Sequence, residues 1–268
     1  MTLTSDHHNL LGDLSNQTVL ITGAGNGIGR GAAHHLATLN ARLVLTDNSS
    51  DALSETINSL PKPDSVHTSI VEDLSTEEGT SNLIKLLDSE EIVTGFVHSA
   101  SPKRIDSDDI FSVNTDTWDA MMNTNARSGF MIARALGQKL TTLKRQGSFV
   151  FVTSLHATTP RNLPHYSASK AAQVMIVKEL ARALGRHGIR VNAVAPGAIP
   201  GGGFDAETSG IDRLIECTSM KRLGTPEDVA RIIGVLLNDE LTGYVTGATI
   251  PVDGGMALHN WITPTNLE

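Results

Sequence analysis

The fold of this chain follows from one stretch, Thr18-Val-Leu-Ile-Thr-Gly-Ala-Gly-Asn-Gly-Ile-Gly29. Its first five residues are mostly β-branched and have the length of a strand, and they pass directly into glycines. A helix is expected to follow from Ile28 to about Asn40, and a second strand over residues 42–46. Glycines between a strand and a helix allow a tight turn and a close approach of the backbone to a pyrophosphate at the helix N-terminus. The stretch therefore predicts a strand–turn–helix unit that binds a nucleotide.

The same alternation of strands and helices continues along the chain. Further helices are expected over residues 50–60 and 76–88, and further strands over 66–71, 92–98, 148–153, 190–195 and 249–252. This order predicts an α/β fold, a doubly wound Rossmann-type parallel sheet of about seven strands with helices on both faces. The last strand is expected at the sheet edge, because Pro251 has no N–H to donate to a neighbouring strand. No linker or repeat interrupts the pattern, so we expect one domain over residues 17–268 after a flexible lead-in, residues 1–16.

Composition excludes several classes of function. The 268 residues carry a formal net charge of −8, and no basic run offers a surface for nucleic acid or an anionic membrane. No apolar stretch has the length of a membrane span, and the N-terminus lacks a signal-peptide pattern. Cys217 is the only cysteine, which excludes a disulfide framework and a thiolate metal site. We expect a cytoplasmic protein that needs no metal and acts on a small molecule.

The glycine-rich turn and the end of the second strand indicate which nucleotide binds. The glycines have the spacing Gly23-x-x-x-Gly27-x-Gly29 rather than the commoner G-x-G-x-x-G. Asp47 ends the second strand, where a carboxylate accepts the ribose hydroxyls of NAD and repels a 2′-phosphate. Asn26 and Asn48, which occupy the positions for a compensating cation, are both neutral. The expected cofactor is therefore NAD rather than NADP.

A second stretch, Tyr166-Ser-Ala-Ser-Lys170, carries a candidate proton-transfer pair. Residues four apart on a helix share one face, so the phenol and the ammonium should lie one turn apart. Two unit charges about 4 Å apart interact by roughly 4 kcal/mol at an effective dielectric near 20. A tyrosine beside such a cation is expected to have a pKa well below about 10. The pair is thus suited to acid–base chemistry.

With these residues in place, the chain resembles the short-chain dehydrogenase/reductases from Thr18 to Gly255. The resemblance rests on ordered motifs along the chain: the turn Thr22–Gly29, Asp73-Leu74, Asn123-Thr-Asn-Ala126, Ser154, the Tyr166/Lys170 pair, Ile189-Arg-Val-Asn-Ala-Val-Ala-Pro-Gly197, Thr246-Gly247 and Val252-Asp-Gly-Gly255.

The resemblance implies a role for each matching residue. Tyr166 would be the general acid/base, and Ser154 would polarise the substrate oxygen. Lys170 would hold the nicotinamide ribose and lower the pKa of the tyrosine, and Asn125 would anchor a water that links Lys170 to solvent. The implied cofactor-binding residues are Gly23, Asn26, Gly27, Ile28, Gly29, Asp47, Asn48, Asp73, Leu74, Ser99, Ala100, Tyr166, Lys170, Pro196, Gly197 and Ile199.

Two departures from the family pattern lie at the expected cofactor site. The family usually shows Asn-Asn-Ala-Gly after the fourth strand, and this chain has His98-Ser-Ala-Ser101. A side chain at Ser101 therefore replaces a glycine beside the cofactor. Gly201 occupies a position where the family often carries a threonine, and Gly201-Gly-Gly203 is flexible enough to act as a closing lid.

Cations and imidazoles gather near the expected mouth of the site: His98, Lys103, Arg104, His156, Arg161 and His165. They would suit a hydroxylated or anionic small molecule such as a sugar or a sugar acid. The expected substrate-binding residues are Ser154, His156, Arg161, Tyr166, Lys103 and Arg104.

These observations favour an NAD-dependent oxidoreductase that transfers a hydride between a secondary alcohol and its carbonyl form. A reductase of 3-oxoacyl thioesters is the first alternative, and a non-catalytic dinucleotide sensor or scaffold is the alternative of another class. The helix after Tyr166 is apolar on most sides, and such a helix should be buried on most sides. A second subunit is the expected cover, which predicts a homo-oligomer, either a tetramer or a dimer.

Overall fold

The computed structural model describes residues 12–61, 67–89, 92–104, 108–201 and 210–258. Seven parallel strands form one sheet in the order β3-β2-β1-β4-β5-β6-β7. The strands are β1 (Thr18–Thr22), β2 (Arg42–Asp47), β3 (Thr68–Val71), β4 (Gly95–His98), β5 (Gly147–Val152), β6 (Ile189–Pro196) and β7 (Thr249–Val252). The predicted parallel sheet is confirmed, and β7 with Pro251 lies at the edge as expected. The predicted lead-in up to residue 11 and residues 202–203 of the predicted lid lie outside the described residues.

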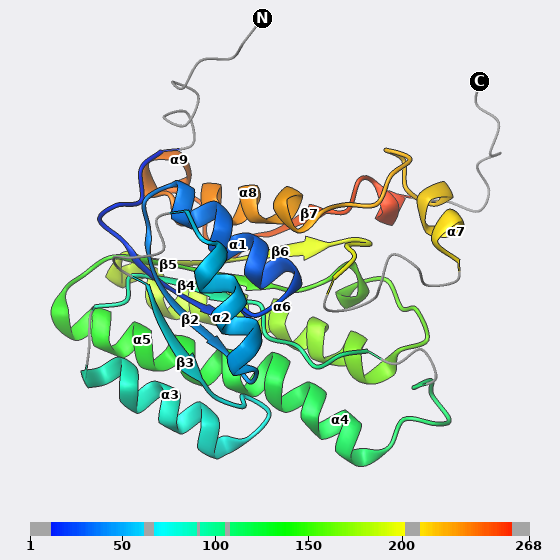
Figure 1. Cartoon of the computed structure of the whole chain (residues 1–268), viewed down its shortest axis with the longest axis horizontal. Helices are drawn as coiled ribbons and strands as arrows, with labels where there is room; N and C mark the ends of the chain where they lie inside the picture. Colours follow the sequence, from blue (N-terminus) through cyan, green and yellow to red (C-terminus); the bar gives the residue numbers. More distant parts are fainter. Residues whose placement is uncertain (1–11, 62–66, 90–91, 105–107, 202–209, 259–268) are drawn as a thin grey trace, which may run out of the picture.

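Helices connect the strands and cover both faces of the sheet (Figure 1). The α-helices are α1 (Gly27–Thr38), α2 (Ser50–Ser59), α3 (Glu77–Ser89), α4 (Thr115–Met122), α5 (Gly129–Leu143), α6 (Pro164–Leu184), α7 (Ile211–Glu216), α8 (Pro226–Leu237) and α9 (Asp239–Thr242). A π-helical segment, η2 (Asn123–Ser128), joins α4 to α5, and 3-10 turns η3 (Leu155–Ala157), η4 (Gly185–His187) and η5 (Met256–Leu258) complete the order. No helix in the described part of the chain is long and apolar enough to cross a bilayer.

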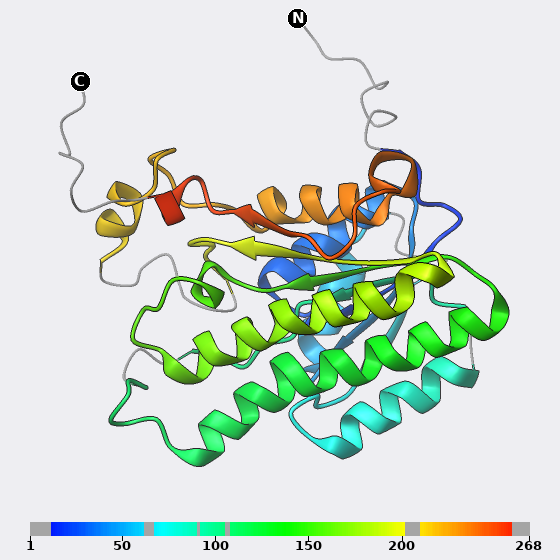
Figure 2. The same ribbon diagram turned by 180° about the vertical axis from the view of Figure 1, so that it is seen from behind.

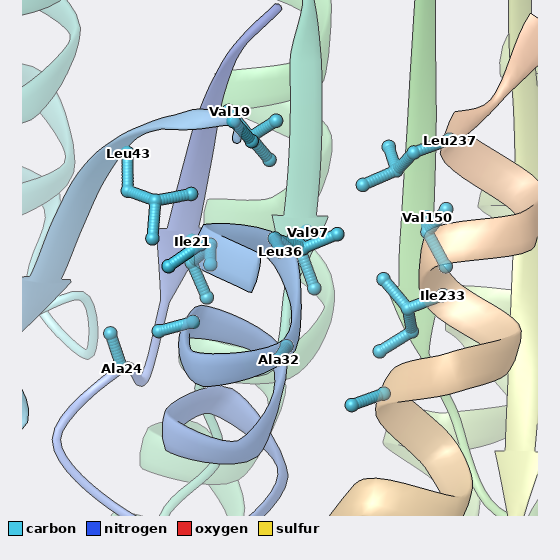
Figure 3. Close-up of a cluster of buried hydrophobic side chains, with 14 of the residues drawn as sticks. Val19, Ile21, Ala24, Ala32, Leu36, Leu43, Val97, Val150, Ile233 and Leu237 are labelled. Carbon is cyan, nitrogen blue, oxygen red and sulfur yellow. The ribbon is translucent and has the colours of Figure 1, made fainter. Parts of the chain in front are cut away.

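Alternation along the strands divides the core into two layers. Val19 and Ile21 pack with residues of α1, α2 and α8, whereas Leu20 faces α3, α5 and α6. Figure 3 shows part of the first layer, where Leu36 from α1 and Ile233 from α8 meet side chains of the strands. Figure 2, seen from the other side, shows α5 and α6 running side by side in front of the sheet. The five inner strands β2, β1, β4, β5 and β6 are therefore buried on both faces, which explains their nearly continuous apolar sequences, whereas the edge strands β3 and β7 are partly exposed.

The strand order reverses between β1 and β4, which are neighbours in the sheet although β2 and β3 lie between them in sequence. In open α/β sheets ligands bind outside the carboxyl ends of the strands at such a reversal. This places the expected binding site beside Thr22 and His98, which end β1 and β4 in register with each other.

Candidate active site

The turn after β1 is packed too closely for side chains at two of its glycines. Gly23 has φ +66°, and a Cβ there would lie 2.7 Å from Ala100 Cα. A Cβ on Gly29 would lie 2.0 Å from the carbonyl oxygen of Gly23. Asn26 caps α1 by accepting a hydrogen bond from the N–H of Gly27 at 2.7 Å. The turn therefore brings bare backbone and the positive end of α1 to the carboxyl edge of the sheet.

A cavity of about 260 Å³ opens at this edge. Six of the predicted cofactor residues line it: Gly23, Asp47, Asn48, Asp73, Leu74 and Ala100. Ser101, which was expected beside the cofactor, also lines this cavity. Five further lining residues were not predicted from the sequence: Glu72, Ser75, Pro102, Ala120 and Thr124. The carboxylate of Asp47 accepts hydrogen bonds from the N–H groups of Gly25 at 2.9 Å and Ser49 at 3.2 Å. The described lining contains no lysine or arginine, so its fixed charge is negative.

Three further predicted cofactor residues, Pro196, Gly197 and Ile199, lie at the end of β6 and in the segment after it. Pro196 ends β6, and the N–H of Gly197 donates to the carbonyl of Val252 at 3.1 Å. Ile199 is buried and lines a neighbouring cavity of about 550 Å³ rather than the first one. A Cβ on Gly201 would lie 3.4 Å from Gly27 Cα, so this segment passes over the turn after β1. Gly201 has φ +98°, a backbone conformation that favours glycine, so a threonine at this position would be strained.

Tyr166 and Lys170 lie in the first two turns of α6, which begins at Pro164. Both side chains are buried, with 8% and 2% of their surface exposed. Lys170 Nζ lies 5.5 Å from the centroid of the Tyr166 ring and donates to the carbonyl of Val152 at 2.9 Å. Burial, and secondarily the charge of Arg104, lowers the pKa of Lys170 to about 7. The predicted pair is therefore held together in the interior, with the ammonium tied to the end of β5.

Ser154 lies two residues beyond β5 and caps the short turn η3. Its hydroxyl oxygen accepts a hydrogen bond from the N–H of His156 at 3.2 Å, which leaves the hydroxyl proton able to point elsewhere. The His156 ring packs edge-on against the Tyr166 ring, with 5.2 Å between centroids. This contact brings the turn that begins at Ser154 against the tyrosine.

Asn125 lies inside the π segment η2 and is fully buried. Its Nδ2 donates to Ser169 Oγ at 2.8 Å, and that hydroxyl donates to the carbonyl of Tyr166 at 2.8 Å. Asn125 Oδ1 is buried and has no hydrogen-bond partner in the described part of the chain. Asn125 is therefore linked to the main chain of Tyr166 through the Ser169 hydroxyl, and its own side-chain oxygen is left open.

The cationic rim that we expected is only partly formed. The Arg104 guanidinium lies 4.8 Å from the Tyr166 ring centroid, and Lys103 is exposed to solvent. Burial, followed by the charges of Arg104 and Arg161, lowers the pKa of His156 to about 4, so its imidazole is neutral near pH 7. The placement of His98 and His165 at the mouth was wrong, because both side chains are fully buried. His98 shares a strand face with Phe96, which is part of the core.

The shape and the charges of this site fit a nicotinamide dinucleotide. The turn of glycines after β1 and the N-terminus of α1 form a binding site for a pyrophosphate. The acidic cavity beside them can hold the adenosine ribose. The buried Tyr166 and Lys170, with Ser154 near by, supply a proton donor or acceptor where a nicotinamide and an alcohol would meet.

Comparison with known proteins identifies the family. A family model described as enoyl-(acyl carrier protein) reductase matches residues 23–257. The chain is 30% identical over 257 residues to (3R)-3-hydroxyacyl-CoA dehydrogenase from Homo sapiens, which covers 91% of this chain and 96% of the relative. The chain belongs to the short-chain dehydrogenase/reductase family, whose members are oxidoreductases that bind a nicotinamide dinucleotide.

Two further similarities span almost the whole chain. Glucose 1-dehydrogenase 2 from Bacillus subtilis is 28% identical over 267 residues, 96% of this chain and 99% of the relative. The solved structure of levodione reductase has a TM-score of 0.83 at 27% identity and covers 91% of this chain and 99% of that one. The resemblance stated from the sequence is confirmed at the level of the family and the fold.

The lowered pKa of Lys170 predicts a pH-dependent stability. The pKa is about 7 in the fold and 10.5 without the protein environment, so between these values the unfolded chain binds more protons. The penalty of burying the ammonium is therefore complete below pH 7 and is relieved as the pH rises. Relative to Lys170→Met, the wild type should gain up to about 1.4 kcal/mol in free energy of unfolding per pH unit within this window. Urea unfolding of both proteins from pH 6 to 9 measures this difference, and an equal pH profile for the two would contradict a perturbed lysine.

Proposed function

We propose that this protein is an NAD-dependent oxidoreductase that interconverts a secondary alcohol and its carbonyl form. The observation that carries the proposal is the buried Tyr166/Lys170 pair, which adjoins Asn125 and the turn of Ser154. A dinucleotide sensor has no use for an acid–base pair in its interior. The roles that follow are those that these side chains can perform at the positions they occupy.

The proton chemistry centres on the tyrosine. When an alcohol is oxidised, Tyr166 accepts the hydroxyl proton, and in the reverse direction it donates a proton to the carbonyl oxygen. The Ser154 hydroxyl, whose oxygen already accepts from His156, donates to the same substrate oxygen. Lys170 supplies positive charge beside the phenol and can pass a proton toward Asn125 Oδ1 through a water. A nicotinamide bound at this site would accept or supply the hydride.

The acidic cavity supports NAD rather than NADP. Asp47, Glu72 and Asp73 all line it, and no described cation does. A 2′-phosphate placed there would meet like charges in a partly desolvated site, whereas ribose hydroxyls can donate to a carboxylate. Asp47 is already fixed by two backbone N–H groups, so it cannot turn away without giving up those bonds.

The residues around Tyr166 support a small hydroxylated or anionic substrate such as a sugar, polyol or sugar acid. Arg104 lies over the tyrosine ring, and Arg161 is close enough to lower the pKa of His156. Arg161 Nε is buried without a hydrogen-bond partner in the described structure, which leaves a donor for a substrate oxygen. The similarity to a glucose dehydrogenase is consistent with this substrate class.

A 3-hydroxyacyl or 3-oxoacyl thioester is the second candidate substrate. The similarity to (3R)-3-hydroxyacyl-CoA dehydrogenase favours it, since that relative covers nearly the whole chain. A thioester needs the same proton chemistry but a longer acyl and carrier site. Initial rates of NADH formation with polyols, aldoses and sugar acids, compared with 3-hydroxyacyl-CoA, separate the two candidates.

Tyr166→Phe tests the catalytic role directly. The substitution removes the hydroxyl and keeps the ring against His156 and Arg104, so the fold should survive. Turnover of whichever substrate the wild type accepts should fall by at least about 100-fold. NADH binding, followed by fluorescence, should remain within a few-fold of wild type. Wild-type turnover in this variant would remove tyrosine as the acid/base group.

The cofactor preference is tested by the charge of Asp47. We expect kcat/KM for NADH to exceed that for NADPH by about tenfold or more, equivalent to about 1.4 kcal/mol. Asp47→Asn keeps an oxygen that can accept from the N–H of Gly25 and removes the negative charge. The ratio of kcat/KM for NADH to kcat/KM for NADPH should therefore decrease. A wild type that prefers NADPH would refute the proposed cofactor.

We also propose a homo-oligomer, dimer or tetramer, assembled through the outer face of α6. Ala171 and Met175 are exposed on this helix, and Met175 retains 56% of its surface, while its other side packs on the sheet. Light scattering should give a mass of two or four chains, and Met175→Glu should reduce it. The matched control is Val71→Glu, which places the same charge on the edge strand β3, away from α6, at a residue that is 50% exposed. This variant should keep the mass of the wild type. A monomeric wild type would contradict this assembly.

A further inference from the structure

His98 connects the cofactor turn to the catalytic helix segment through the interior. Its Nδ1 lies 2.9 Å from Thr22 Oγ1, and its Nε2 lies 3.1 Å from the carbonyl oxygens of both Thr124 and Asn125. Carbonyl oxygens only accept, so Nε2 carries the hydrogen and Nδ1 accepts from the Thr22 hydroxyl. Thr22 Oγ1 in turn accepts from the N–H groups of Ser99 and Ala100, each at 3.2 Å. The direction of every hydrogen bond in this chain is therefore fixed.

The imidazole stays neutral in this position. Burial, and secondarily the charge of Lys170, lowers the pKa of His98 to about 3. A neutral ring has one donor nitrogen and one acceptor nitrogen, which matches the two carbonyls on one side and the hydroxyl on the other. His98 therefore acts as a hydrogen-bonding spacer and adds no charge beside Lys170.

The π segment η2 is what turns these carbonyls toward the ring. A π turn inserts an extra residue into the helix and replaces i→i+4 bonds by i→i+5 bonds, so its carbonyls point in other directions than those of an α-helix. The Thr124 carbonyl also accepts from Ser128 Oγ at 2.7 Å, and the Asn125 carbonyl also accepts from Gln173 Nε2 at 2.7 Å. Gly129 makes room for the ring, since a Cβ there would lie 2.6 Å from His98 Cδ2.

Gln173, on helix α6, donates a second hydrogen bond to the carbonyl of Asn125. It is fully buried on α6, one turn beyond Lys170. With His98 and Gln173 both donating to it, the Asn125 carbonyl has no acceptor capacity left. The side-chain Oδ1, which is buried and has no hydrogen-bond partner in the described part of the chain, is then the acceptor that Asn125 keeps open.

We propose that His98 and Gln173 are positioning residues that clamp the main-chain carbonyl of Asn125, and so hold its side chain against Ser169. The consequence for catalysis rests on the proposed function, because it assumes that Tyr166 and Lys170 move the proton. The clamp itself does not depend on the proposed function, because it is defined by hydrogen bonds within the fold.

Two substitutions of similar size at position 98 separate the two ends of the ring. In His98→Gln the amide Nε2 reaches as far as the imidazole Nε2 and can still donate to the carbonyls. In His98→Asn the amide reaches only as far as the imidazole Nδ1. It therefore keeps the hydrogen bond with Thr22 and loses the hydrogen bonds to the carbonyls of Thr124 and Asn125. Gln173→Leu removes the other donor at nearly constant volume. Thermal unfolding of each variant establishes that it is folded.

Hydrogen exchange over residues 123–129 tests the clamp without any turnover. Exchange of these amides should quicken by about tenfold in His98→Asn and in Gln173→Leu, while His98→Gln stays near wild type. Unchanged exchange in both His98→Asn and Gln173→Leu would overturn the proposal. So would equal acceleration in His98→Gln and His98→Asn, because the reach of the donor would then not matter.

Kinetics test the consequence for catalysis. In His98→Asn and Gln173→Leu we expect kcat to fall by about 10- to 100-fold, as for a catalytic group displaced by about 1 Å. NADH affinity should stay within about threefold, and His98→Gln should recover most of kcat. A kcat within twofold of wild type, despite faster exchange, would refute the positioning role. If Tyr166→Phe retained full turnover, the proposed function would fail, and the exchange results would still decide the clamp.

Discussion

A buried ammonium is the constraint around which this site is built. Lys170 is almost fully buried, and the hydrogen bond that holds its Nζ goes to the main-chain carbonyl of Val152 at the end of β5. A carbonyl carries only a partial charge, so it offsets part of the cost of removing the ammonium from water. The remaining cost appears as the lowered pKa of the lysine. A charge that is easily lost is of little use for stability and well suited to moving a proton.

The fold provides the other groups because parallel strands end at one edge. The turn after β1, Asp47 after β2, the acidic segment after β3 and Ser154 after β5 all reach this edge without long loops. Helix α6 adds Tyr166 and Lys170 from its first turns, and η2 brings Asn125 against it. Just beyond the ends of β1 and β4, Gly23 lies against the main chain of Ala100, and this contact leaves no room for a side chain at position 23.

The sequence was sufficient for the sheet and for the turn of glycines after β1, because each depends on local pattern. The parallel sheet of about seven strands and the edge position of β7 followed from strand–helix alternation and Pro251, whereas the order of the strands was not predicted. The placement of His98 failed for a physical reason that the sequence contained. Side chains two residues apart on a strand share a face, so His98 had to lie on the side of Phe96, in the core. Position at a strand end indicates nearness to the site and does not indicate the direction of the side chain.

The π segment could not have been found in this way. Nothing in the sequence from Asn123 to Ser128 marks a π turn, and only the folded structure shows that Thr124 and Asn125 direct their carbonyls to His98, and Asn125 also to Gln173. Gln173 looked like one polar residue on an apolar helix. Its partner is a main-chain atom far away in sequence, and such partners leave no side-chain pattern to recognise. Glu72 was missed for a related reason, since a second carboxylate beside Asp73 adds to a cavity that only the assembled strands define.

The neutral imidazoles make the charge of the site depend on what binds there. His98 and His156 have pKa values of about 3 and about 4, so near pH 7 the positive charge around Tyr166 comes from Lys170 and the arginines. Arginine does not lose its proton, and the charge of Arg104 contributes to the lowered pKa of Lys170. An anion bound beside Arg104 would offset that repulsion and favour the protonated lysine. Because such coupling is reciprocal, a charged Lys170 would bind the anion more tightly by the same factor. Substrate binding and the charge that assists the tyrosine would then be one linked equilibrium, and a neutral alcohol would not engage it.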